Sequence, residues 1–282
     1  MKIDGKLIAE SIKILLKDKL LSLTEKKIIP QLAIVLVGED PSSLNYVAQK
    51  QKIGEELEIK ILLCRLKNTD SQNELINLVY RLNTDQDIHG IIIQRPVPIG
   101  IDREELDNLV IPEKDLDGFH PDSPFTPPVA SAVVKILKWV YKGVRSSSNS
   151  RSDPEFPRWL KDKKILIIGR GETGGKPVAQ TLEKMGIRFI VAHSKTNNLK
   201  ELCLTSDIII SCVGKPNIVR PQMVADYTIL IGVGLHEENG KLQTDYNQHE
   251  IAEKVAYYTP VPGGVGPVNV IYLFENLLKF MV

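Results

Sequence analysis

The sequence predicts an α/β protein with two domains. Its 282 residues suit two domains of about 100–200 residues each better than one small core. Short apolar segments alternate with segments whose apolar residues recur at helical spacing, a pattern typical of helices packed on a parallel sheet. A glycine-rich turn in the second half of the chain separates one such apolar segment from a helical one, which predicts a Rossmann-like second domain.

The first half of the chain predicts three strands with helices between them. Residues 6–22 carry apolar side chains at helical spacing with charged residues between them. The nearly continuous apolar run 31–38 is typical of a strand buried on both faces of a parallel sheet. The same criteria predict helices at 43–57 and 72–83, and strands at 59–66 and 90–94.

The second half repeats this alternation. The criteria predict strands at 163–169, 188–194, 207–214 and 228–234, and helices at 128–141, 177–185, 198–204 and 267–281. The intervening residues 143–157 are polar, serine-rich and aperiodic. We therefore expect them to form a flexible surface segment with no role in an active site.

Composition narrows the class of protein. The formal net charge is +1, so bulk electrostatics do not indicate nucleic acid as a partner. No apolar run approaches the ~18–20 residues of a membrane span, and the first residues lack the apolar core of a signal peptide, so a cytoplasmic protein without a membrane partner is expected. The three cysteines, Cys64, Cys203 and Cys212, show no metal-binding or disulfide spacing and are expected to be small buried hydrophobes.

The glycine-rich turn matches the dinucleotide fingerprint G-x-G-x-x-G. It follows a predicted strand and precedes a predicted helix, so its backbone N–H groups and the helix N-terminus are expected to bind a pyrophosphate. A tight turn with incidental glycines is the simpler alternative. The residues expected to contact the cofactor here are Gly169, Arg170, Gly171, Thr173, Gly174 and Gly175.

The second strand of this unit favours NADP over NAD. An NAD site usually has an acidic residue near the end of this strand, where it binds the ribose hydroxyls. Here the strand ends in His193, Ser194, Lys195 and Thr196, with no acid. Together with Arg170, the side chains of Ser194 and Lys195 suit a ribose 2′-phosphate. A solvated loop lysine is the alternative for Lys195.

Three polar residues gather at predicted strand ends in the first half. Tyr46 and Lys50 are four residues apart on one predicted helix, so they share a face. That helix begins at the carboxyl end of strand 31–38, where open α/β sheets bind ligands. Gln94 lies at the carboxyl end of another predicted strand and is expected to reach the same place. By itself, the Tyr46/Lys50 pair is more often an amphipathic surface feature.

Several longer segments carry a resemblance to a known family. Residues 3–9 read IDGKLIA, 46–52 YVAQKQK, 90–98 GIIIQRPVP, 112–121 PEKDLDGFHP, and 259–267 TPVPGGVGP. These segments resemble the bifunctional methylenetetrahydrofolate dehydrogenase/methenyltetrahydrofolate cyclohydrolase family, and the resemblance covers almost the whole chain. The last two strings are long and unusual, so a chance match is implausible.

The resemblance implies an enzyme of folate one-carbon metabolism that also supplies purine biosynthesis. It implies NADP-dependent oxidation of 5,10-methylenetetrahydrofolate to methenyltetrahydrofolate, followed by hydrolysis to 10-formyltetrahydrofolate. Tetrahydrofolate one-carbon derivatives are thus the expected substrates, no metal is expected, and a homodimer through the Rossmann sheet edge is implied. The expected domains are 1–122, completed by the C-terminal helix 267–282, and a cofactor domain 123–266, with the folate cleft between them.

The resemblance also implies roles for individual residues. Lys50 is expected to be the general acid/base of hydrolysis, with Gln94 hydrogen-bonded to it and helping to set its protonation. Tyr46 is expected to pack against the substrate and Asp117 to bind the polar edge of the pterin. Burial can depress a lysine pKa, and a carboxylate is the natural acceptor for the donor edge of an aminopterin. The residues implied to line the cleft are Pro262, Gly263 and Gly264.

Some positions depart from the family pattern. Gly171 stands where a serine is usual, which removes a hydroxyl from the expected 2′-phosphate site, and Arg95 stands where a leucine is usual. Arg95 is expected either to depress the Lys50 pKa further or to contact the carboxylates of the folate tail. The open alternatives are a cyclohydrolase with weak or lost dehydrogenase activity, an unrelated shikimate-type NADP dehydrogenase, and a non-catalytic nucleotide-binding regulator.

Overall fold

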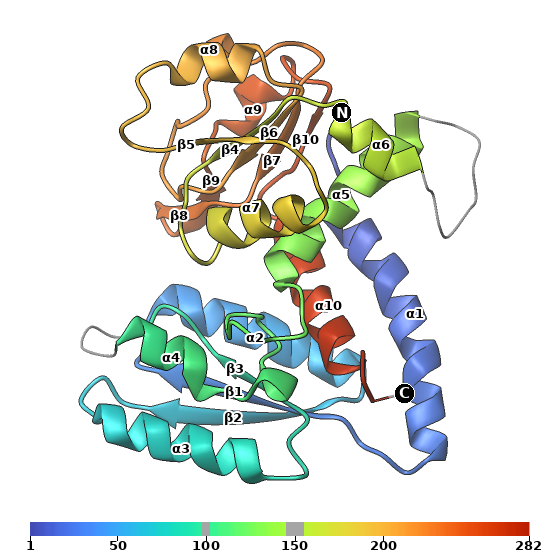
Figure 1. Ribbon diagram of the computed structural model, residues 1–282, viewed down its shortest axis with the longest axis vertical. Coiled ribbons are helices and arrows are strands. Elements are labelled where there is room, and N and C mark those ends of the chain that lie inside the picture. The colour runs from blue at the N-terminus through green and yellow to red at the C-terminus, as the bar shows by residue number, and fades with distance from the viewer. Residues whose placement is uncertain (98–101, 145–154, 282) are drawn as a thin grey trace. The chain divides into compact units, whose positions relative to one another are not determined.

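The computed structural model describes residues 1–97, 102–144 and 155–281, and these form two compact units. Unit 1 comprises Met1–Glu10 and Val129–Asn269, and unit 2 comprises Ser11–Pro128 and Val270–Val282. Helices α1 (Gly5–Glu25) and α10 (Val265–Leu277) each begin in unit 1 and end in unit 2 (Figure 1). The α/β class is confirmed. The domain limits at residues 122 and 266 stay a prediction.

Unit 2 contains a three-stranded parallel sheet in the order β2-β1-β3. The strands are β1 (Gln31–Val37), β2 (Lys60–Leu66) and β3 (Gly90–Ile93), with α2 (Pro41–Glu56) and α3 (Gln72–Thr84) as the connecting helices. These elements lie within a few residues of their predicted limits. Every residue of β1 and β3 is buried, as the continuous apolar runs indicated.

Helices cover both faces of this sheet. On one face, Val35 and Ile93 belong to a core that also contains Leu75 and Val79 of α3 and Leu106 of the short helix α4 (Arg103–Leu109). On the other face, α2 packs closely on β2, and the C-terminal part of α10 packs at β3 (Figure 1). The carboxyl ends of β1 and β3 lie beside the start of α2, where Ser43 Oγ donates to the Arg95 carbonyl oxygen.

Helix α4 has no counterpart among the predicted elements. It begins after Asp102, whose carboxylate accepts a hydrogen bond from the backbone N–H of Glu105 at 2.9 Å. The 3-10 turn η1 (Pro112–Lys114) follows. A helix of seven residues shows less than two full repeats of the helical period, so its apolar spacing carries little signal.

Unit 1 contains a five-stranded parallel sheet in the order β10-β7-β6-β4-β5. Its predicted strands are confirmed as β4 (Ile165–Ile168), β5 (Ile190–Ala192), β6 (Ile208–Ser211) and β7 (Ile229–Gly232). The predicted helices of this unit are α5 (Pro128–Val144), α7 (Gly175–Lys184) and α8 (Leu199–Leu204). Elements absent from the prediction are η2 (Pro221–Met223), the antiparallel hairpin β8 (Leu235–Glu238) and β9 (Lys241–Thr244), α9 (Gln248–Ile251) and β10 (Tyr257–Tyr258).

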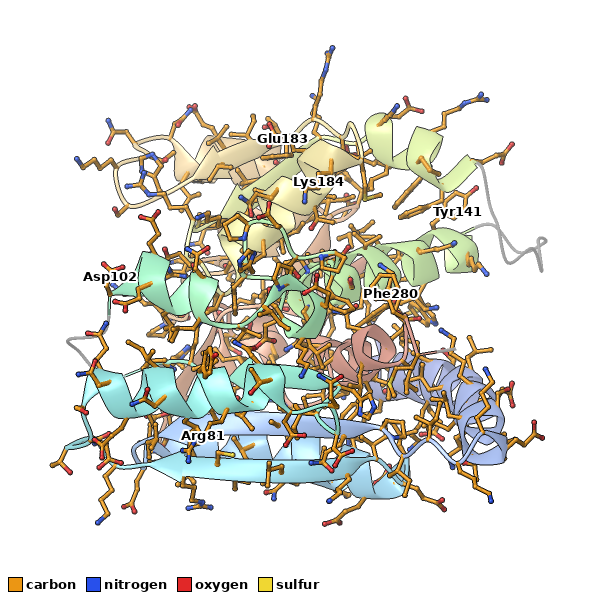
Figure 2. All side chains as sticks on the ribbon, turned by 60° about the horizontal axis from the view of Figure 1, so that its bottom comes forward. Arg81, Asp102, Tyr141, Glu183, Lys184 and Phe280 are labelled. Atoms are coloured by element: carbon orange, nitrogen blue, oxygen red, sulfur yellow. The ribbon has the colours of Figure 1, made fainter. Side chains whose placement is uncertain are left out.

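The prediction of a flexible segment at 143–157 is wrong at both ends. Gly143 and Val144 are the last residues of α5, and α6 (Glu155–Lys161) begins inside the segment. Phe156 is buried because its ring packs against Tyr141 of α5 and Trp159 of α6, with ring centroids 5.7 and 6.0 Å away. Tyr141 lies beside α6 (Figure 2). Residues 145–154 lie outside the described residues, as do Pro98 of the GIIIQRPVP string and its neighbours to 101.

The C-terminal helix α10 begins two residues earlier than predicted and ends four earlier. In unit 2 its buried Asn276 donates two hydrogen bonds, to the carbonyl oxygens of Leu116 at 2.9 Å and Thr126 at 3.1 Å. The last helix therefore ties down the loop that follows η1.

In the described ranges, no helix is both long and apolar enough to cross a membrane. All three cysteines are free thiols. Cys203 is buried as predicted, whereas Cys64 and Cys212 are only partly buried.

Candidate active site

The start of α2 places Tyr46 and Lys50 at the carboxyl end of β1. Asp40 caps the helix by accepting a hydrogen bond from the Ser43 N–H at 2.8 Å, and Pro41 occupies its first position. These two residue types favour helix initiation, so the chain turns into α2 only a few residues after β1. Tyr46 and Lys50 follow one turn apart on this helix.

Lys50 and Gln94 form the centre of the site. The Lys50 ammonium nitrogen lies 2.8 Å from Oε1 of Gln94, and the two residues are only 7% and 8% exposed. The other end of the Gln94 amide donates to the Arg95 carbonyl oxygen at 2.8 Å, which orients Oε1 toward Lys50. Burial lowers the pKa of Lys50 from its ordinary value, while the nearby Asp117 acts in the opposite direction. The expected contact between Lys50 and Gln94 is therefore present.

Asp117 lies in the turn that follows η1. Burial raises its pKa, and the charges of Lys50 and Arg95 lower it. The turn depends on Gly118, whose φ is +69° and whose added Cβ would lie 2.8 Å from the Phe125 carbonyl oxygen. Asp117 thus interacts electrostatically with Lys50, and its expected binding of the pterin edge stays a prediction.

A second carboxylate, Asp115, stabilises the same turn. Its Oδ2 accepts a hydrogen bond from the His120 N–H at 2.8 Å. Burial raises the Asp115 pKa to about 6, and the neighbouring Asp117 adds to that rise. Two carboxylates in one buried turn repel each other unless cations are close.

Tyr46 lies partly buried on the same helix face as Lys50. Burial raises the pKa of its phenol, so the ring stays neutral at physiological pH. A neutral aromatic ring provides a flat apolar surface with one polar tip.

Lys114 anchors the loop that carries Asp115 and Asp117. Its ammonium group donates to the carbonyl oxygens of Leu82, Asn83 and Asp85, at 3.1, 2.8 and 2.7 Å. These carbonyls lie at the C-terminal end of α3, where the helix leaves acceptors unpaired and the macrodipole favours a cation.

Replacing Lys114 by Met should lower the free energy of unfolding by about 1–2 kcal/mol, because charge-assisted hydrogen bonds at a partly exposed helix end are lost. Urea denaturation would measure the change. Lys67→Met, at an exposed loop lysine, is the control and should leave stability within about 0.5 kcal/mol. Equal stability of the two variants would contradict the anchoring role.

In unit 1, the glycine-rich turn joins β4 to α7. Gly174 is the N-cap of α7, and the Lys176 N–H donates to the Gly171 carbonyl oxygen at 2.9 Å. A Cβ on Gly175 would lie 2.0 Å from the Gly169 carbonyl oxygen, so only glycine permits this close approach. Arg170, Gly171 and Thr173 are exposed on the turn.

The end of β5 lies next to this turn. Ala192 pairs with Ile168, and the Gly169 N–H donates to the Ala192 carbonyl oxygen at 2.9 Å. Ser194 and Lys195 follow at once and are exposed, and the Lys195 N–H is held by His193 Nδ1 at 3.2 Å. A bound dinucleotide would therefore meet exposed cations and hydroxyls beside its pyrophosphate turn.

The segment Pro262–Gly264 also belongs to unit 1. The Gly263 carbonyl oxygen accepts a hydrogen bond from the Gly5 N–H at 2.8 Å. Gln248 makes two hydrogen bonds to the backbone of Val261, just before the segment, at 2.8 and 2.9 Å. The middle of the segment and the residue before it are therefore held by hydrogen bonds, and its expected contact with substrate stays a prediction.

Both halves of the chain match the domains of one known protein family. Residues 3–117 match the catalytic domain of the tetrahydrofolate dehydrogenase/cyclohydrolase family, and residues 156–282 match its NAD(P)-binding domain. The chain belongs to this family. Among its relatives, the bifunctional protein FolD of Campylobacter curvus is 36% identical over 99% of this chain and 95% of its own.

Solved structures of family members have the same fold as this chain. The bifunctional FolD dehydrogenase/cyclohydrolase of Campylobacter jejuni superposes with a TM-score of 0.88 at 36% identity, covering 99% of this chain and 97% of that one. The Trypanosoma brucei enzyme, complexed with NADP cofactor and an inhibitor, gives a TM-score of 0.86 at 28% identity, covering 99% and 96%. Family membership removes the support for an unrelated shikimate-type enzyme.

The family domains contain the two predicted sites. Lys50, Gln94 and Asp117 all lie in the family's catalytic domain, and the glycine-rich turn lies in its NAD(P)-binding domain. In the described parts of the chain, no group of three or more His, Cys, Asp or Glu side chains could hold a metal ion.

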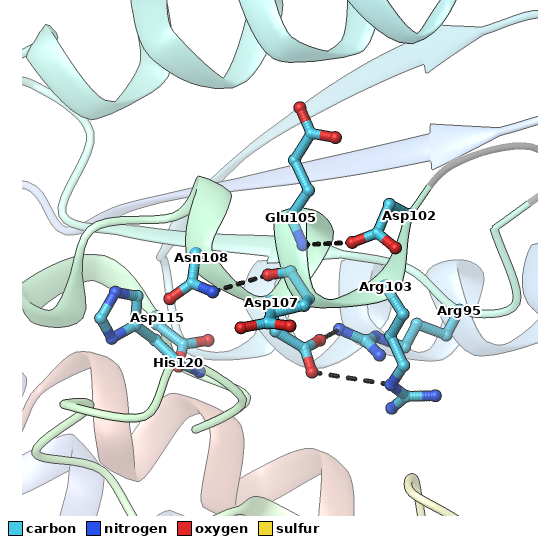
Figure 3. A network of polar contacts seen from close by, with 9 residues as sticks. Arg95, Asp102, Arg103, Glu105, Asp107, Asn108, Asp115 and His120 are labelled. Atoms are coloured by element: carbon cyan, nitrogen blue, oxygen red, sulfur yellow. Dashed lines mark hydrogen bonds and ion pairs between the residues drawn. The ribbon is translucent and has the colours of Figure 1, made fainter.

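Arg95, the departure from the family's usual leucine, is held by a network that the sequence did not reveal. Its guanidinium forms an ion pair with Asp107 of α4, and Arg103 approaches the same carboxylate at 3.6 Å (Figure 3). It also lies over the Phe119 ring, 4.0 Å from the centroid. Because its charge is already paired with Asp107, the expected contact with folate-tail carboxylates loses its support. The lowered Lys50 pKa is due to burial and not to Arg95.

Asp245 was also missed, although it organises the loop after β6. Its fully buried carboxylate accepts hydrogen bonds from Ser211 Oγ at 2.6 Å and from the backbone N–H groups of Val213, Gly214 and Lys215 at 2.9, 2.7 and 3.0 Å. The donors are 30–34 residues away in sequence, and no local pattern marks such a distant partner.

Proposed function

We propose that this chain oxidises 5,10-methylenetetrahydrofolate to methenyltetrahydrofolate with NADP and hydrolyses the product to 10-formyltetrahydrofolate. The observation that supports it best is the buried Lys50–Gln94 hydrogen bond beside Asp117, within the catalytic domain of a family named for both activities.

Hydrolysis depends on proton transfer by Lys50. Burial lowers its pKa, so the neutral amine is available to remove a proton from the water that adds to the cationic carbon of methenyltetrahydrofolate. The resulting ammonium can return the proton when the ring opens. The Gln94 amide oxygen stays within hydrogen-bonding distance and orients the amine in both states.

Substrate orientation depends on Asp117 and Tyr46. An ionised Asp117 offers only acceptors, which match the amino and ring N–H donors of a pterin. The neutral Tyr46 ring offers an apolar face for the flat heterocycle. The role of Pro262, Gly263 and Gly264 at the substrate is part of the same proposal.

The cofactor assignment is NADP, with NAD less favoured. The residues present fit the group: the close Gly169–Gly175 approach permits the tight turn into the helix N-terminus that a pyrophosphate needs, and Arg170, Ser194 and Lys195 suit the 2′-phosphate. When bound, NADP supplies the hydride acceptor. The protein orients the reacting groups and excludes water during this step.

The homodimer, the cytoplasmic location and the supply of purine biosynthesis are further parts of the proposal. The edge strand β5 exposes Ile190 and Val191, at 53% and 37%, and an exposed apolar edge favours pairing with a second copy. A location in the cytoplasm suits an enzyme of one-carbon metabolism that consumes NADP and reduced folates.

The decisive assay mixes the wild-type protein with methylenetetrahydrofolate and either NADP or NAD, and follows the absorbance of the reduced cofactor. Hydrolysis of methenyltetrahydrofolate is followed in parallel. We expect both activities, with NADP preferred. Hydrolysis without reduction would instead support the alternative of a cyclohydrolase that has lost its dehydrogenase activity, which the absence of the usual serine at Gly171 favours. Absence of both activities would overturn the proposal.

A further inference from the structure

Asp117 has two cationic neighbours of different chemical kinds. Lys50 comes from α2 and carries an ammonium group, and Arg95 comes two residues after β3 and carries a guanidinium group. The other charged groups around the small cavity beside Asp117 are Asp107 from α4 and Asp115 from the same turn. Tyr46, on the face of Lys50, is neutral. The charged surroundings of Asp117 therefore consist of two carboxyl groups, from Asp107 and Asp115, and two basic groups, from Lys50 and Arg95.

Arg95 is fixed where its charge acts on Asp117. Arg95, Asp117, Asp107 and Phe119 all line the same cavity. The guanidinium is held from α4 by Asp107 and from the turn by the Phe119 ring, and its side chain is only 12% exposed. Its Nε has no hydrogen-bond partner among the described residues, and its charge lowers the pKa of Asp117. Figure 3 shows the ion pair that holds it.

Turnover makes this second cation necessary. When Lys50 acts as a base it must first be neutral, and Asp117 then loses the positive charge of one neighbour. Burial favours a protonated Asp117, and the charges of Lys50 and Arg95 oppose it. A protonated carboxyl presents a donor where the pterin also presents donors, so it binds the substrate poorly.

We propose that Arg95, tethered by Asp107, is a positioning residue that keeps Asp117 ionised whichever protonation state Lys50 adopts. Because the charge of Arg95 is permanent, the Asp117 carboxylate can keep binding the substrate while the Lys50 amine gains and loses a proton. The backbone of the same residue orients Gln94 toward Lys50, so side chain and main chain serve the two halves of one site. The consequence for turnover rests on the proposed function, whereas the ionisation of Asp117 does not.

The first test is the carboxyl ¹³C NMR titration of full-length protein labelled in its aspartates, with the Asp117 signal assigned by Asp117→Asn. In Arg95→Leu, the midpoint of Asp117 should move to higher pH. The Asp115 midpoint should move less and toward lower pH, because Arg95 does not contribute to its shift and a protonated Asp117 no longer raises it. Arg95→Lys, which restores a cation, should return the Asp117 midpoint toward the wild-type value.

The matched control is Arg103→Leu, which removes a cation from the same Asp107 carboxylate without removing Arg95. It should leave the Asp117 midpoint unchanged. An unchanged midpoint in Arg95→Leu would overturn the proposal, as would an equal shift in Arg103→Leu. This readout needs no folate, so it is independent of the proposed function.

The second test measures methenyltetrahydrofolate hydrolysis across about pH 5–9. In Arg95→Leu, KM should rise by roughly tenfold on the acid side, the loss expected for one charge-assisted hydrogen bond, while kcat on the alkaline side stays near that of wild type. A merely structural role predicts a uniform fall in activity and no change of the pH profile, and that result would contradict the proposal.

Discussion

Replacing Lys50 by Met should reduce the hydrolysis of methenyltetrahydrofolate by about 10²–10⁴-fold, the usual contribution of a positioned acid/base group. Methionine has nearly the length of the lysine stem and suits a site that is only 7% exposed, so the fold should survive. Gln94 Oε1 loses its partner, which should cost about 1–3 kcal/mol of stability. Binding of NADP should be unchanged, because the glycine-rich turn belongs to the other unit.

The pH dependence of the hydrolysis rate provides an independent check on the acid/base role of Lys50. Burial lowers its pKa from 10.5, and removal of a proton from water requires the neutral amine. Hydrolysis by the wild type should therefore rise as the pH increases through the lowered pKa, and this rise should vanish in Lys50→Met. Lys52→Met, at the exposed lysine two residues later, is the control and should keep both rate and profile. Wild-type rates of hydrolysis in Lys50→Met would show that Lys50 is not the general acid/base.

Replacing Asp245 by Ala should lower the free energy of unfolding by about 3–5 kcal/mol, because one buried acceptor serves four donors. The loop over residues 213–215 would lose its three backbone hydrogen bonds. Just before it, the Cys212 N–H donates to the Ile168 carbonyl oxygen at 2.7 Å, directly next to Gly169 of the glycine-rich turn. The affinity for NADP should therefore fall together with stability.

Urea denaturation and an NADP titration would measure the two effects of Asp245→Ala. Asp226→Ala, at an exposed aspartate of the same unit, is the matched control and should change stability by less than about 0.5 kcal/mol. Saturating NADP should recover part of the lost stability, since a ligand that binds only the folded state stabilises it. A loss of less than about 1 kcal/mol would show that water replaces the carboxylate, contrary to this expectation.

The sequence predicted the elements whose pattern is local and long enough to repeat. β1 and β4 were recognised from continuous apolar runs, and α1 from its helical spacing. α4, at seven residues, and β10, at two, are too short to show a period. The β8–β9 hairpin was missed because all its residues except the buried Thr244 are half-buried or exposed, without strict alternation.

In the candidate site, too, some contacts could be predicted from the sequence and others could not. The contact between Lys50 and Gln94 was predictable because parallel strands end at a common edge, so residues that follow β1 and β3 converge. The partnership of Arg95 with Asp107 was not, because it depends on a helix that the pattern did not reveal. Asp245 looks like any loop aspartate in the sequence, and only the fold brings its four donors together.

The hold of Asn276 on the Asp117 loop has a consequence for protein synthesis. The asparagine lies 160 residues after Leu116, whose carbonyl oxygen it binds. The ribosome completes β1, β2 and β3 long before Asn276 is translated, so the emerging chain carries every catalytic side chain while its substrate-binding loop still lacks this clamp. The two hydrogen bonds from Asn276 to this loop can therefore form only after residues 117–275 have also been translated. A premature stop codon just before Asn276 would leave the acid/base chemistry encoded and the loop that presents the substrate unsecured.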